Sequence, residues 1–95
     1  MTASTNVTPR IARFVEANFD DAALVLDALR DWKISYEDEL PGERLTAAVV
    51  LFADGSLEGV DEAFALAETD WRDLLVAAGV AHADYEDVLR RRLGE

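Results

Sequence analysis

The sequence of 95 residues contains no cysteine and a single histidine, His82. Without cysteine there is no disulfide, no thiolate metal ligand and no cysteine nucleophile. With one histidine there is no His-pair metal site, and a Ser-His-Asp relay has no spare member. Glycine-rich phosphate loops and EF-hand spacing are also missing. We therefore expect no enzymatic activity, no cofactor and no metal.

Long apolar runs are missing as well. No stretch reaches the ~20 residues needed to cross a bilayer. The first seven residues are rich in Thr, Ser and Asn, and they lack the basic start and apolar run of a signal peptide. We expect a cytoplasmic protein without membrane contact, in which residues 1–8 are a disordered leader and residues 9–95 are a single helical domain.

Basic residues are scarce. Nine Lys and Arg stand against twenty Asp and Glu, which gives a net charge of −11. Residues 16–73 hold sixteen of the acids and four of the bases. Such a field repels nucleic acid and anionic membranes, and it favours solubility or a basic partner. We expect no nucleic acid, and an unknown protein partner of basic character, with solubility alone as the simpler interpretation.

The stretch 45–53 is apolar on every side, so it has to be buried. Its valines also suit a strand, and the Asp54-Gly55 pair that follows is a hairpin signal. However, the residues after this turn alternate at helical spacing, so a second strand is not available. We predict a buried central helix at about 43–54, which ends in a left-handed turn at Gly55.

Other helices are predicted from caps and periodicity. Thr8-Pro9 opens the first helix. Asp20-Asp21 opens a second helix that runs to about Trp32. An irregular connector is expected at 34–42, and a last helix at about 83–93. The second helix is expected to bury Leu24, Val25, Ala28, Leu29 and Trp32. The fold class is therefore all-α, a compact bundle of five or six short helices around the central one.

Between the central helix and the last one, apolar residues alternate at intervals of three and four over 57–78. This pattern fits one helix of 22 residues, or two helices broken at Thr69-Asp70. The spacing of Asp70 and Asp73 before an apolar run resembles a helix start, so the break is favoured. A homodimeric coiled coil along the seam is the alternative.

Residues 74–88 carry the weak pattern of a helix-turn-helix around Gly79. The second helix of this pattern would bring Asp84, Glu86 and Asp87 toward the bases, where acids are unfavourable. Arginines 90–92 are suited to a phosphate backbone. A DNA-binding regulator that uses the C-terminal helix is therefore the alternative function.

Two acidic clusters are the candidate site. Their members are Glu37, Asp38, Glu39, Asp61 and Glu62. Neighbouring carboxylates on a helix diverge by about 100° and rarely share a proton, so acid–base chemistry is not expected of them. We interpret them as the surface that faces a basic partner. The function predicted from the sequence is a non-catalytic module for protein–protein interaction or regulation.

The segment 70–79, preceded by 51–55, resembles a pattern that recurs in small, acidic, all-helical proteins of actinobacteria. The resemblance covers about the second half of the chain. It implies a bacterial cytoplasmic protein, and it brings with it no activity and no site residues.

Overall fold

The structure, a computed structural model, describes residues 7–32 and 42–94, which form five α-helices and no strand. In chain order the helices are α1 (Pro9–Asn18), α2 (Ala22–Asp31), α3 (Gly42–Ala53), α4 (Leu57–Ala78) and α5 (Tyr85–Leu93). The prediction of an all-α fold around a central helix is confirmed. The connector expected at 34–42 lies outside the described residues, except for Gly42, which begins α3.

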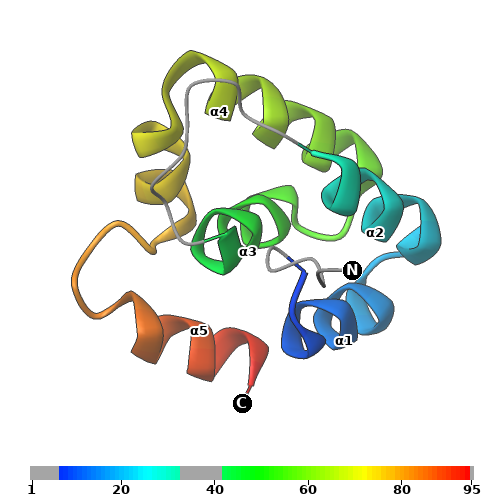
Figure 1. The fold of residues 1–95 in the computed structure, drawn as a ribbon, viewed down its shortest axis with the longest axis horizontal. Helices are drawn as coiled ribbons and strands as arrows, with labels where there is room; N and C mark the ends of the chain where they lie inside the picture. Colours follow the sequence, from blue (N-terminus) through cyan, green and yellow to red (C-terminus); the bar gives the residue numbers. More distant parts are fainter. Residues whose placement is uncertain (1–6, 33–41, 95) are drawn as a thin grey trace, which may run out of the picture.

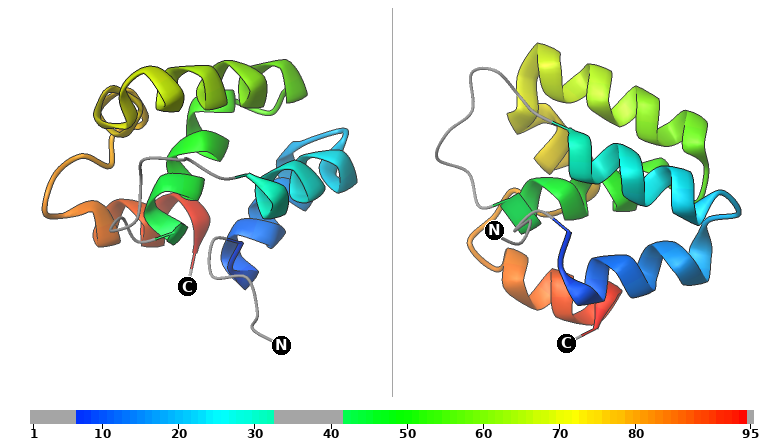
Figure 2. Two further views of the ribbon diagram at one scale, coloured as in Figure 1. Left: turned by 45° about the horizontal axis from the view of Figure 1, so that its top comes forward. Right: turned by 45° about the vertical axis from the view of Figure 1, so that its right-hand side comes forward.

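Helix α3 occupies the centre of the molecule. Figures 1 and 2 show α4 on one side of it and α5 on the opposite side, with α1 and α2 along a third side. Seven of its twelve residues are buried, because a helix that is apolar all round has no face to offer to water. The buried residues are Leu45, Thr46, Ala47, Ala48, Val49, Val50 and Ala53.

A close backbone contact joins the end of α3 to the start of α4. A Cβ atom on Gly59 would lie 2.8 Å from the Cα atom of Ala53, so only glycine fits there. The turn between the helices is left-handed at Asp54 (φ 54°) and Gly55 (φ 88°), as predicted for Gly55. Ser56 then begins α4, and its hydroxyl accepts a hydrogen bond from the Gly59 amide at 2.9 Å.

Helix α4 is kinked where the break was predicted. The backbone of Asp70 is extended (φ −163°, ψ 101°), and its Oδ1 accepts a hydrogen bond from the Arg72 amide at 3.0 Å. Asp70 thus ends the first half of α4 (57–69) and caps the second (71–78). The residues of the 57–78 seam pack against the core of their own chain, so the seam is not an exposed stripe for a coiled coil.

Helix α2 corrects one of the predictions. Leu24 was expected inside but is 57% exposed, whereas its neighbours Val25 and Leu26 are buried. Apolar periodicity locates a stripe only to within about one position, and the packing of α2 against α1 and α4 buries Val25, Leu26 and Leu29.

The ends of the domain also differ from the expectation. The last helix begins at Tyr85 rather than Ala83, because the Asp84 carbonyl is the one that accepts from the Val88 amide. The disordered leader expected at 1–8 falls mostly outside the described residues. At its end Val7 packs against the core, and Thr8 begins α1 without a side-chain cap.

Candidate functional site

The structure describes two of the five predicted site residues. Asp61 and Glu62 lie side by side in the first half of α4, and both are exposed. They face solvent because the opposite side of this helix, with Val60 and Ala63, is buried in the core. The other three, Glu37, Asp38 and Glu39, lie outside the described residues.

Asp61 and Glu62 belong to a larger acidic surface on α4. Four exposed carboxylates recur there at helical spacing, and we call them the α4 acidic stripe: Glu58, Asp61, Glu62 and Glu68. The first half of α4 contains no Lys or Arg, and none of the four carboxylates forms an ion pair with another described residue. The stripe therefore projects an uncompensated negative field from one face of one helix.

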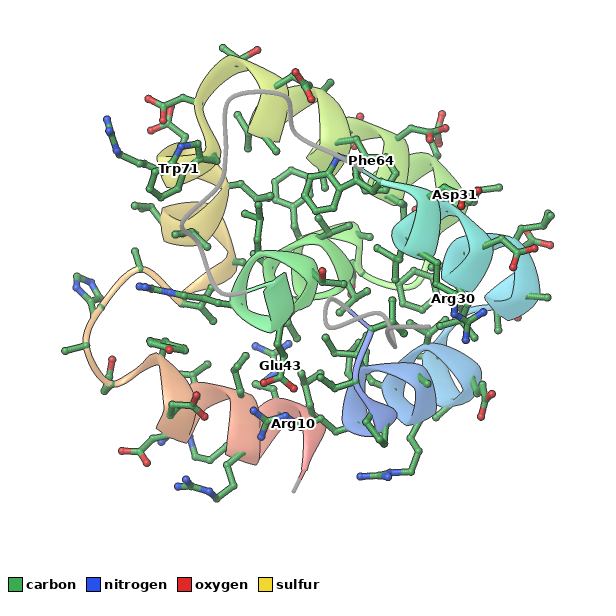
Figure 3. All side chains as sticks on the ribbon, viewed as in Figure 1. Arg10, Arg30, Asp31, Glu43, Phe64 and Trp71 are labelled. Atoms are coloured by element: carbon green, nitrogen blue, oxygen red, sulfur yellow. The ribbon has the colours of Figure 1, made fainter. Side chains whose placement is uncertain are left out.

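The helix that carries the stripe is firmly held. Besides the Ser56 cap and the close contact at Gly59, the Phe64 ring stacks on Trp32 with centroids 4.6 Å apart. This stacking brings the end of α2 against α4, and Figure 3 shows Asp31 at that end, near Phe64. Asp31 is also exposed, next to the exposed Arg30.

The chemistry open to this surface is electrostatic. Among the described residues, no group of three or more Asp, Glu or His side chains is placed to hold a metal ion. Carboxylates that project separately into water attract cationic groups over roughly a Debye length, about 8 Å at physiological salt. The stripe is suited to attracting Lys and Arg side chains of another molecule, in a manner that added salt weakens.

A second charged site was not expected from the sequence. Arg10 Nε and Nη2 each donate a hydrogen bond of 2.8 Å to the Glu43 carboxylate, which also accepts one of 2.6 Å from Thr8 Oγ1. Arg10 Nη1 donates to the Gly94 carbonyl at 3.1 Å, and Nη2 lies 3.5 Å from Glu86 Oε1. The Arg10 and Glu43 side chains are 13% and 22% exposed, the most buried ion pair among the described residues.

This pair joins three helices, because Arg10 lies on α1, Glu43 on the first turn of α3, and Gly94 just after α5 (Figure 3). The hydrogen bond from Arg10 holds the pKa of Glu43 below its ordinary value of 4.5, although partial burial opposes this shift. A general acid at neutral pH needs a raised pKa instead. The geometry is therefore that of a structural connection rather than of a proton donor.

The residue after Glu43 makes a second connection to the C-terminal part. Arg44 Nε donates to the Val80 carbonyl at 2.9 Å, and its guanidinium lies 4.1 Å from the centre of the Tyr85 ring. Such a cation–π contact is attractive and partly replaces lost hydration. In the sequence, the one sign of both connections is the pair of charged residues, Glu43 and Arg44, at the start of an otherwise apolar helix.

In the region with the helix-turn-helix pattern, the connection between the two helices is longer than the short turn of that motif. Gly79 ends α4 with a left-handed turn (φ 82°), but six residues, 79–84, separate α4 from α5. The acids at the start of α5, Asp84, Glu86 and Asp87, are all exposed.

The chain matches no protein-family model, no curated protein and no solved structure. None of the described helices is both long enough and apolar enough to span a membrane.

Proposed function

We propose that this protein is a non-catalytic module for protein–protein interaction, and that the α4 acidic stripe contacts a basic surface of its partner. The observation that supports the proposal is the set of four exposed carboxylates on one helix face, without a base among them. Uncompensated charges of one sign steer association and select partners of the opposite sign. The bacterial cytoplasm, as the proposed compartment, rests on the resemblance found in the sequence.

The rigidity of the stripe adds to this support. Its helix is capped by Ser56, packed without a Cβ at Gly59 and stacked through Phe64, so the carboxylates are held at fixed spacing before a partner arrives. A surface that is organised in advance loses less conformational entropy on binding. The alternative from the sequence, DNA binding through α5, gains no such support, because α5 presents acids at its first turn.

A capture experiment with matched variants tests the proposal. The tagged protein is exposed to a bacterial lysate and washed at low and then at high salt, and the retained proteins are identified by mass spectrometry. The stripe variant is E58Q/D61N/E62Q/E68Q. The control removes the same number of charges from other exposed positions, as E16Q/D20N/D73N/D84N.

We expect a basic protein that the wild type and the control retain at low salt, and that the stripe variant does not. High salt should release it, because exposed charges are screened. Equal loss in both variants would show that only the net charge matters. Retention by the stripe variant would show that the partner binds elsewhere.

A further inference from the structure

The C-terminal helix is attached in a different way from the other helices. Only two of the nine residues of α5, Leu89 and Leu93, are buried; α1 buries as few, but it packs against α2 and α3 as well as α5, and α3 buries seven of twelve. Its packing partner is α1. Tyr85 and Val88 are partly buried against the core as well, so the apolar attachment of α5 consists of four side chains on one face of the helix.

Polar contacts at both ends of α5 add to this attachment. At its start, Arg44 contacts the Tyr85 ring and holds the Val80 carbonyl just upstream. At its end, Arg10 donates to the Gly94 carbonyl. Glu43 touches neither end of α5, but it fixes the Arg10 guanidinium through two hydrogen bonds. We call Arg10, Glu43 and Arg44 the arginine latch.

The connection before α5 leaves room for movement. It runs over residues 79–84 outside any helix, and a Cβ at Gly79 would meet nothing within 4 Å. In contrast, α3 and α4 are joined by a tight turn, where Gly55 lies against the Asn18 carbonyl and Gly59 against Ala53. Val80 and Ala81 anchor the start of this connection in the core, so the chain is open at 82–84, just before α5, and closed between α3 and α4.

From these contacts we infer that α5 is a lid, held closed by the arginine latch, which opens as a unit while α3 and α4 remain folded. Opening exposes the apolar face of the domain that Leu89 and Leu93 cover. In the latch, Glu43 is a positioning residue, because it acts on α5 through Arg10. The inference is independent of the proposed function, which concerns the opposite side of α3.

Native-state hydrogen exchange tests the inference on the intact chain. In the wild type, the amides at 89–93 should exchange at least about tenfold faster than those at 46–50, because sub-global opening requires less free energy than global unfolding. Low denaturant concentrations should accelerate the amides of α3 more steeply than those of α5. Equal rates and equal denaturant dependence in the two helices would overturn the inference.

The variant E43Q then tests the latch. Its α5 amides should exchange about tenfold faster than in the wild type, since a charged hydrogen-bonding partner is lost; the α3 amides, which exchange through global unfolding, should accelerate at least as much because the same bonds are lost there. E62Q makes the same substitution on the α4 acidic stripe, and it should alter neither helix. Acceleration of α3 without α5 in E43Q would show that the pair stabilises the body of the domain rather than holding α5, and it would contradict the latch, as would no acceleration of either helix. If E43Q does not fold, R44Q tests the second arm with the same two outcomes.

Discussion

The junction between α3 and α4 and the attachment of α5 hold the same domain together in different ways. The first is apolar and so close that Gly59 has no room for a Cβ. The second relies on two arginines that reach a ring, two carbonyls and a carboxylate. Apolar packing contains no group that titrates, whereas the polar attachment depends on charge and geometry. The comparison predicts where the domain is robust and where it responds to conditions.

The largest loss of folding stability is expected when a charge is placed in the apolar interior of α3. Val50 is fully buried, so Val50→Asp places a carboxylate where it finds no partner and costs about 4 kcal/mol or more. Since a small domain has roughly 5–15 kcal/mol in total, most of the protein should unfold. Val76 is 68% exposed, and Val76→Asp should change the stability by less than about 0.5 kcal/mol. Urea unfolding followed by circular dichroism measures both, and a stable Val50→Asp variant would refute the buried centre.

The next effect concerns the close contact itself. Gly59→Ala inserts a methyl group against the backbone of Ala53, which cannot move cheaply, and should cost about 2 kcal/mol or more. Gly79→Ala is the control, because space is open there and only the left-handed backbone is strained, at about 1 kcal/mol. The midpoints of thermal unfolding should follow this order. The reverse order would mean that the junction is looser than described.

The polar side of the comparison should respond to acid. Because the pKa of Glu43 is lowered in the folded protein, its contribution to stability is present above its ordinary pKa of 4.5 and is lost as the pH falls through the folded value. Glu43→Gln should cost about 1 to 3 kcal/mol at neutral pH and remove this part of the acid sensitivity. The measurement is the free energy of unfolding between pH 7 and pH 3. Glu62→Gln should keep the wild-type slope, and an unchanged slope in Glu43→Gln would refute the role of the pair.

The smallest effect compares the starts of two helices. The Ser56 hydroxyl caps α4, so Ser56→Ala should cost about 1 kcal/mol. Asp84 precedes α5 without a side-chain cap, and Asp84→Ala should cost only a few tenths of a kcal/mol through the helix dipole. Chemical denaturation resolves this difference. Equal costs would show that the Ser56 hydroxyl contributes no more to α4 than the Asp84 charge contributes to α5.

Much of the fold could be predicted because its signals are local. The break at Asp70 and the left-handed turn at Gly55 depend on residues within a few positions of one another. The outer position of Asp61 and Glu62 follows likewise from the period of one helix.

The features that could not be predicted depend on contacts between segments far apart in the sequence, which the periodicity of one helix does not encode. Leu24 was placed inside because a stripe on one helix does not specify its rotation against a neighbour. The Arg10–Glu43 pair joins residues 33 positions apart. The sequence contains many other acids and does not indicate which of them forms the ion pair with Arg10. The bond from Arg10 to the Gly94 carbonyl spans 84 positions.

The sequence by itself thus determined that the described part of the chain is helical, where its helices turn, and that most of 45–53 is buried, with Leu51 and Phe52 only partly so, since backbone conformation and amphipathicity are properties of neighbouring residues. Only the tertiary structure decided which charges are paired and which remain exposed. In the folded protein, Glu43 helps to connect three helices through Arg10, and the carboxylates of the α4 acidic stripe remain exposed to water. Burial and pairing depend on the three-dimensional surroundings of each side chain, and these form only when distant segments pack together.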